Sequence, residues 1–236
     1  MSCDRAFLDL LGFFEFGCTR RVALPMGAQR LLAFLALQSD GAHRATTAEQ
    51  LWPDCTSCRA AANLRSALCQ ARRVGSVTVI ECIGQRLRLS ELINVDLHRV
   101  TESARQIIAA QNPVTALGNG LIEDLSKELL PGWSEGWLML ERERWNQLRI
   151  HALESLAQQY QTAEQYLSAL QTALAVIAID PFRETAHRIL IEVHVAEGNF
   201  ASALKCYRDY QAFLQQELDA VPSPQMRQLV QELKSA

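Results

Sequence analysis

The sequence predicts a mostly α-helical protein in which a small domain of strands and helices precedes an all-α domain of repeated helices. Three observations predict this class. Short apolar segments punctuated by Gly alternate with helical segments up to residue 90, helical periodicity dominates after residue 91, and a 34-residue repeat falls between residues 156 and 208. We place the domain boundary so that the two domains are residues 1–92 and 93–236.

Composition sets the broad class of protein. The 236 residues are 49% hydrophobic and 21% charged, which is typical of a globular chain with an ample core. No run of about 18 apolar residues occurs, and the first residues carry no cleavage-type small-residue site, so we expect neither a membrane span nor a signal peptide. Seven Cys, an odd number, favour reduced thiols in the cytoplasm over a disulfide framework.

Charge is distributed unevenly along the chain, although the formal net charge is only −3. Residues 1–90 hold eleven Arg and seven acids, whereas residues 91–236 hold twelve basic and nineteen acidic residues. This division predicts that the first half, and not the second, meets a polyanion. A chance fluctuation of composition is the alternative.

The first elements are predicted to be short strands followed by two helices. Gly and Pro bound three apolar strand segments, at residues 7–11, 14–16 and 22–24. Residues 30–38 are apolar throughout and predict a buried helix. Thr46 and Glu49 have the spacing of a capping box at the start of a short helix that Pro53 stops.

The next helix, at residues 57–73, carries the strongest functional signal. Its inner stripe has helical spacing and consists of Ala60, Leu64, Ala67, Leu68 and Ala71. Its other faces hold Arg, Asn, Ser, Cys and Gln without one acid between residues 59 and 73. Such a face suits a DNA groove, because Arg pairs with guanine and Asn or Gln with adenine. A solvated surface helix is the alternative, but a solvated face usually mixes charge signs.

A hairpin follows this helix. Residues 77–80 and 86–89 read as two short strands across a turn that contains Gly84. The order of helix, basic helix and hairpin is that of a winged helix-turn-helix, whose wing reaches the DNA backbone or minor groove. The predicted DNA-binding residues are Arg44, Thr46, Arg59, Asn63, Arg65, Ser66, Cys69, Arg72, Arg73, Arg86 and Arg88.

Residues 91–236 are predicted to be almost entirely helical. Asp96 begins a helix that Asn112 and Pro113 end, and Gly118 and Gly120 interrupt the next segment. A turn at residues 129–133 precedes a long helix that runs through Tyr160.

The repeat lies in the last part of this half. Residues 156–174 match residues 190–208 at an offset of 34, so that Tyr166 matches Phe200 and Ala169 matches Ala203. A 34-residue unit with an aromatic residue after its turn and a small Ala three positions later is typical of tetratricopeptide repeats. Such units stack into a curved array whose concave face usually binds a protein.

Signals for catalysis and for metal binding are weak. The sequence holds no phosphate-binding loop, no HExxH and no GxSxG, and its five His are dispersed. Cys55 and Cys58 form a CxxC that lacks the second pair of a zinc site, so we expect no metal and no cofactor. A redox switch at this pair is the alternative to ordinary thiols. The sequence therefore predicts a protein without enzymatic activity.

Several blocks of the chain together resemble the SARP-type bacterial transcriptional activators, a family with a winged helix followed by a bacterial transcriptional activator domain. The blocks are LLGFFEF, RLLAFLAL, EQLWPD, NLRSALCQARR, GQRLRL, ELLPGW, WLMLERERW, EGNFASALKCYRDY and QELDAVPSPQMRQL. The resemblance covers about residues 7 to 233. The chain departs from it at residues 27–29, where a Gly-x-Lys is usual, and at Asp219, where Gly is usual. Asp tolerates the left-handed conformation, so we expect the turn at residue 219 to form.

The resemblance implies a cytoplasmic bacterial transcription regulator. It implies binding to double-stranded promoter DNA at direct repeats, as a homodimer or as tandem protomers, and activation through contact with RNA polymerase. Two other functions stay open: an interaction scaffold whose repeats capture a signalling protein, and a regulator whose repeat groove binds a signal molecule. The acid-free helix beside an Arg-bearing wing favours DNA binding over the scaffold.

Overall fold

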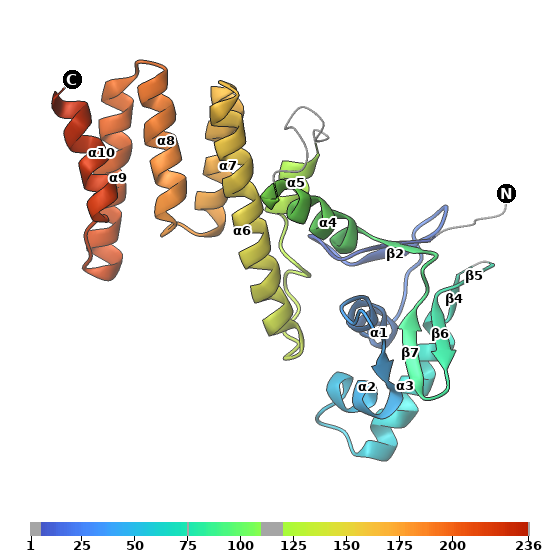
Figure 1. Ribbon diagram of the computed structural model, residues 1–236. Coiled ribbons are helices and arrows are strands. Elements are labelled where there is room, and N and C mark those ends of the chain that lie inside the picture. Colours follow the sequence, from blue (N-terminus) through green and yellow to red (C-terminus); the bar gives the residue numbers. More distant parts are fainter. Residues whose placement is uncertain (1–5, 75, 110–119, 236) are drawn as a thin grey trace. The chain divides into compact units, whose positions relative to one another are not determined.

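The computed structural model describes residues 6–74, 76–109 and 120–235. Figure 1 shows its helices and strands, coloured along the sequence. The chain forms two compact units. The first takes the described residues up to Val100 together with Lys127–Trp145, and the second takes the described residues of 101–126 and 146–235. Helices α4 (Asp96–Ile108) and α6 (Leu138–Thr162) each contribute residues to both units. The domain boundary at residues 92 and 93 stays a prediction.

The first unit begins with a three-stranded sheet. Strand β1 (Ala6–Asp9) lies between β2 (Glu15–Gly17), which is antiparallel to it, and β8 (Ile93–Val95), which is parallel. The third predicted strand, at residues 22–24, is wrong: this segment has only an adjacent isolated bridge between Gly17 and Arg21 and a bond from Val22 N to Phe16 O of 2.8 Å. Pro25 follows at once and opens a helix, which leaves no room for a ladder.

Three helices form the core of this unit. Helix α1 (Met26–Ala36) is apolar over most of its length and packs on α3 (Ser57–Ala71), as does α2 (Arg44–Leu51). The predicted cap at Thr46 is wrong, because α2 begins two residues earlier. His43 is the capping residue: its Nδ1 accepts a hydrogen bond from Ala45 N at 3.4 Å, and its carbonyl accepts one from Thr47 Oγ1 at 3.0 Å.

The wing is the hairpin of β6 (Ile80–Ile83) and β7 (Arg86–Leu89), with Gly84 at a φ of 59° in its turn. Strand β3 (Ala42–His43) pairs with the other edge of β7. The predicted strand at residues 77–80 divides in two, since β5 (Val77–Thr78) pairs with β4 (Arg73–Val74) while Ile80 already belongs to the wing. Val79 N donates to Arg72 O at 2.8 Å between the two ladders, which joins the wing to the end of α3.

Residues 127–145 complete the first unit. Trp137 stacks edge-on against Phe34 of α1, and Trp145 Nε1 donates to Lys127 O at 3.0 Å.

Asp96, the first residue of α4, accepts hydrogen bonds from the backbone of Leu10 and Leu11 at 2.8 and 2.9 Å. The predicted helix start at Asp96 is confirmed; its predicted end at Asn112 and Pro113, and Gly118, lie outside the described residues.

The second unit consists of helices. Besides parts of α4 and α6 it holds α5 (Leu121–Ser126), α7 (Tyr166–Ile179), α8 (Glu184–Ala196), α9 (Phe200–Leu218) and α10 (Pro224–Ser235). Helix α8 packs against both α7 and α9. The repeat is confirmed, because α7 and α9 begin at the two matched aromatic residues and the matched Ala169 and Ala203 are fully buried. Helix α9 ends in Asp219 at a φ of 50°, so the expected left-handed turn forms there.

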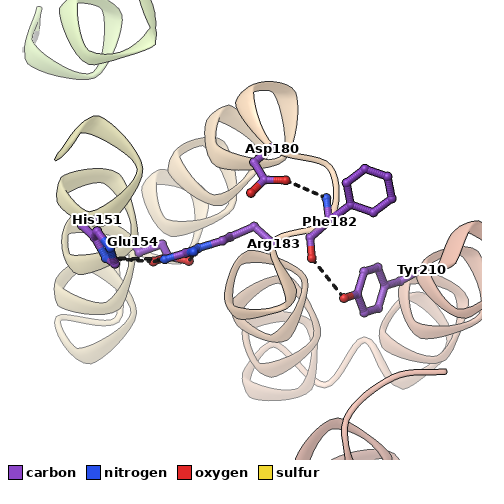
Figure 2. A network of polar contacts seen from close by, with 6 residues as sticks. All are labelled: His151, Glu154, Asp180, Phe182, Arg183 and Tyr210. Atoms are coloured by element: carbon purple, nitrogen blue, oxygen red, sulfur yellow. Dashed lines mark hydrogen bonds and ion pairs between the residues drawn. The ribbon is translucent and has the colours of Figure 1, made fainter. Parts of the chain in front are cut away.

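A polar network stabilises the junction between the repeats (Figure 2). Arg183, just before α8, donates from Nε and Nη2 to the buried carboxylate of Glu154 in α6, at 2.9 and 3.1 Å. The backbone of Phe182 accepts a hydrogen bond from Tyr210 at 3.3 Å and donates one to Asp180 at 3.1 Å. The turn that follows α7 is thereby bonded to helices on both sides of it.

Five of the described cysteines are free thiols: Cys55, Cys58, Cys69, Cys82 and Cys206. Cys18 is disulfide-bonded. The expectation of reduced thiols therefore holds for these five cysteines and is wrong for Cys18.

Candidate nucleic-acid interface

Helix α3 separates an apolar face from a cationic one. The five residues predicted for its inner stripe are all buried, with exposed fractions of 6% or less. Arg59, Arg65, Ser66 and Cys69 are exposed on the other side, and Arg72 and Arg73 are exposed directly after the helix. Its five Ala favour the helical state, and the inner stripe fixes its rotation. Arg and Ser side chains are thus presented outward by packing rather than by local hydrogen bonds.

A cavity of about 430 Å³ lies beside this face. It brings together α2, α3, the residues after α3, and the wing, and its lining consists of Arg44, Arg65, Leu68, Cys69, Arg72, Arg73 and Cys82. Pairing of β3 with β7 and the bond from Arg44 N to Gln85 O, at 2.9 Å, hold Arg44 beside the wing. Four of the predicted arginines therefore converge although they lie up to 29 positions apart in sequence.

A second hollow, of about 290 Å³, shares Arg44 and Arg65 with the first. Its lining includes Ser57 of α3, Glu49 of α2, and Gln85 at the tip of the wing. Gln85 and Cys82 belong to this region without having been predicted as site residues. The Gly84–Gln85 turn between two strands is the sequence signal that could have placed them there.

The arginines of this region differ in what neutralises them. Within the described ranges 6–74, 76–109 and 120–235, no carboxylate forms a salt bridge with Arg44, Arg59, Arg65, Arg72, Arg73 or Arg86. Arg88 differs: its Nη2 lies 2.8 Å from Glu91 and 3.7 Å from Glu81. Arg88 is therefore partly neutralised within the protein, whereas the other six guanidinium groups have no carboxylate of the described residues within ion-pair distance.

The remaining predicted residues take separate positions. Asn63 is half-buried, and its Nδ2 lies 3.9 Å from Cys55 Sγ as a weak donor. Thr46 is exposed inside α2 rather than at its cap. Neither residue lines the larger cavity.

Among the residues that the structure describes, no three His, Cys, Asp or Glu side chains group so as to hold a metal ion. No described helix is long and apolar enough to span a membrane. In the second unit, Leu167 and Leu174, seven positions apart on α7, are 69% and 54% exposed.

Residues 120–234 match the family model described as the bacterial transcriptional activator domain. The chain contains a bacterial transcriptional activator domain. The family resemblance predicted from the sequence is thereby confirmed for this part of the chain. The matched range includes residues 127–145 of the first unit, so the family domain and the compact units do not coincide.

A solved structure is similar over almost the whole length. "Mycobacterium tuberculosis EmbR in complex with low affinity phosphopeptide" superposes with a TM-score of 0.78 and 18% identity, and the alignment covers 98% of this chain. The chain spans 65% of the length of that protein. The likeness shows the fold, and it confirms the predicted class of a winged helix-turn-helix followed by an all-α domain. Comparison with curated protein sequences found no match.

Proposed function

We propose that the chain is a sequence-specific, DNA-binding transcription regulator that activates its target promoters and has no enzymatic activity. One observation carries the proposal: four arginines from two helices and the residues beside the wing converge on one cavity without a neutralising acid. Duplex DNA is the polyanion that a helix beside a wing fits, with the helix in the major groove. The bacterial transcriptional activator domain supports the same role.

The residues divide by the chemistry they offer. Arg65, Ser66 and Arg59 are exposed on the outer face of α3 and are proposed to approach base edges, with Asn63 beside them. Arg44, Arg72, Arg73 and Arg86 are proposed to approach phosphates, where a guanidinium can form two parallel hydrogen bonds.

Selection of bound sequences from a random duplex pool, followed by footprinting, tests this function. The proposal expects a recurring motif whose protected positions include the major groove. Binding that recovers no motif, or no binding at low salt, would contradict it. The full chain is the protein to use, because Lys127–Trp145 belongs to the first unit and truncation after residue 92 would remove it.

A single recognition helix reads only a few base pairs, which is too little against the roughly 10⁶ or more competing sites of a genome. We therefore propose two protomers side by side on direct repeats, about one helical turn apart. Insertion of half a turn between the repeats should weaken joint binding about tenfold or more, in a titration of the selected duplex. Equal affinity for the original and the shifted site would contradict this arrangement.

We propose that the second unit contacts RNA polymerase or the neighbouring protomer. Its exposed Leu167 and Leu174 lie two helical turns apart on α7 and are apolar side chains that a protein partner could cover. The proposal expects that purified chain increases transcription from a promoter bearing the selected repeats. It also expects Leu167→Glu to lower that increase while DNA affinity stays unchanged. These partners imply a location in the bacterial cytoplasm.

A further inference from the structure

Two free thiols lie within the arginine-lined cavity. Cys69 comes from α3 and Cys82 from β6 of the wing, both side chains are exposed, and both line the 430 Å³ space. Its other lining residues are four arginines and Leu68. A cavity of this volume is within the range of small-molecule sites, which begins at about 300 Å³.

We propose that Cys69 and Cys82 form a thiol-modification site that takes small anionic disulfides and whose modification weakens DNA binding. The effect on DNA rests on the function proposed above. The pair differs from Cys55 and Cys58, the CxxC considered from the sequence, neither of which lines this cavity.

Charge provides the selectivity for the reagent. Arg44, Arg65, Arg72 and Arg73 surround the thiols, and none of them forms a salt bridge with an acid of the described residues. Unscreened positive charge around a hollow raises the local concentration and the association rate of anions, by about 10-fold or more at low salt. An anionic disulfide is therefore attracted to Cys69 and Cys82 and less strongly to a thiol outside the cavity.

The chemistry is thiol–disulfide exchange. The sulfur of Cys69 or Cys82, as the thiolate, attacks one sulfur of the disulfide and forms a new S–S bond with that half. The old S–S bond breaks, the other half leaves as its thiolate, and the proton of the cysteine passes to solvent. The small disulfide is the oxidant, and an added dithiol reverses the step.

The effect of modification on DNA binding depends on the position of the adduct. An anionic group in the cavity pairs with the same arginines that are proposed to meet the DNA phosphates. Fewer phosphates are then neutralised and fewer counterions released on binding, so the affinity and its salt dependence both fall. A neutral adduct fills the same space without adding a charge, and it separates the effect of charge from that of bulk.

The first arm of the test measures which cysteine reacts. Full chain is treated with dithiobis(nitrobenzoate), an anionic disulfide, or with dithiodipyridine, a neutral one, and each cysteine is followed by peptide mass spectrometry. Cys58 is the internal control, since it is exposed on the same helix but outside the cavity. Cys69 and Cys82 should react with the anionic reagent about tenfold faster than Cys58, and salt should reduce the advantage. Equal rates at low salt overturn the proposal.

The second arm measures binding to a random-sequence duplex at low salt, which needs no knowledge of the target. Modification with the anionic reagent should weaken binding about tenfold, and dithiothreitol should restore it. In the Cys69→Ser, Cys82→Ser variant, whatever its affinity before treatment, neither treatment should change binding, and Cys58→Ser should respond to both as the natural chain does. If the double variant does not fold, the single variants Cys69→Ser and Cys82→Ser replace it: each keeps one thiol in the cavity, and each should lose affinity only in proportion to the modification of that thiol. Modified natural chain that binds as well as before overturns this inference alone, whereas untreated chain that binds no duplex overturns the proposed function and this inference with it.

Discussion

Arg86 and Arg88 occupy the same strand of the wing and project on the same side of it, but they differ in their neighbours. Arg86 is exposed and forms no ion pair within the described residues, whereas Arg88 lies between Glu81 and Glu91. A guanidinium already paired with carboxylates gains less from a phosphate, because one partner replaces another. The two arginines are therefore not equivalent in DNA binding.

Arg86→Ala should lower the slope of log affinity against log salt concentration by about 1, since one phosphate contact is lost. Arg88→Ala should change the slope less, because the positive charge that it removes is already paired with Glu81 and Glu91. The two acids then remain near the DNA. A titration of one duplex at several salt concentrations measures both. Equal changes in the slope for the two variants would show that the ion pairs of Arg88 open on binding.

The individual residues show where the sequence was sufficient. The inner stripe of α3 was predicted completely, because buried positions on a helix recur with a fixed period. The cap of α2 was not, since Thr46 and Glu49 have the spacing of a capping box while His43 takes the position through its ring nitrogen. The pairing of Arg88 with Glu91 depends on the hairpin geometry, which residue types alone do not provide.

At the scale of elements, the network of Figure 2 connects α6 to the junction between α7 and α8. Glu154 is 7% exposed, and among the described residues Arg183 supplies both hydrogen bonds that its carboxylate accepts. The His151 ring lies beside them, with its Nδ1 3.8 Å from the carboxylate and 3.5 Å from Arg183 Nη2. A buried carboxylate that loses its partner remains desolvated without compensation.

Arg183→Ala should therefore lower the free energy of unfolding by about 2–3 kcal/mol, as measured by urea denaturation. Arg188→Ala is the matched control. Its guanidinium lies 3.8 Å from Glu192 with both side chains partly exposed, so the loss should be below about 1 kcal/mol. Replacement of both members, Glu154→Leu with Arg183→Met, should recover most of the stability. A loss for Arg183→Ala no larger than that of the control would contradict the account.

His187 makes the stability of the packing between α8 and α9 depend on pH. Its ring stacks on Tyr210 with centroids 4.0 Å apart, and its Nε2 donates to Pro181 O at 3.0 Å. Burial lowers the pKa of His187 below its usual 6.5, against smaller opposing effects of the Pro181 carbonyl and of Glu184. The unfolded chain then binds a proton more readily than the folded chain, so the contribution is present above pH 6.5 and is lost as pH falls through the lowered pKa.

The free energy of unfolding should thus fall between pH 7.5 and pH 5.5, and part of that fall should disappear in His187→Phe, which keeps an aromatic ring but cannot titrate. Urea denaturation of both proteins at the two pH values measures the difference. An identical fall in the variant would show that other groups carry the whole dependence.

Elements were predicted unevenly. The starts of α7 and α9 coincide with the matched aromatic residues of the repeat, and its matched Ala residues lie in the core, because close packing of helices fixes the small and aromatic positions. The segment at residues 77–80 was placed in one strand, yet β5 and β6 divide it between two partners. Strands of two to four residues are defined by what they pair with, and the partner is not encoded locally.

At the scale of the whole molecule, the first compact unit is built from two separate stretches of the chain. Residues 127–145 return to the first unit, where Arg142 bonds the carbonyls of Leu129 and Leu130 and Trp137 contacts Phe34. Composition and periodicity report only the local state of these residues. Their attachment depends on contacts across about a hundred positions, which periodicity does not reveal.

The cavity of the candidate interface is likewise a property of the assembled unit. Its arginines are all among the predicted DNA-binding residues. Arg44 lines the same cavity as Arg65 and Cys82 because β3 pairs with the wing. No sequence motif indicates this pairing. Sequence identified the groups, and tertiary structure brought them together.

The central claim is that the exposed face of α3 reads bases, and one measurement tests it most directly. The affinity of the full chain is measured for the selected duplex and for its single-base variants, with natural chain, Arg65→Ala and Arg21→Ala, whose side chain is exposed but paired with Glu15 at 2.9 Å. The account predicts that Arg65→Ala loses about 1–3 kcal/mol on the selected duplex and no longer discriminates at one base pair, while Arg21→Ala behaves as the natural chain does. An equal loss on the selected duplex and on unrelated DNA would contradict it.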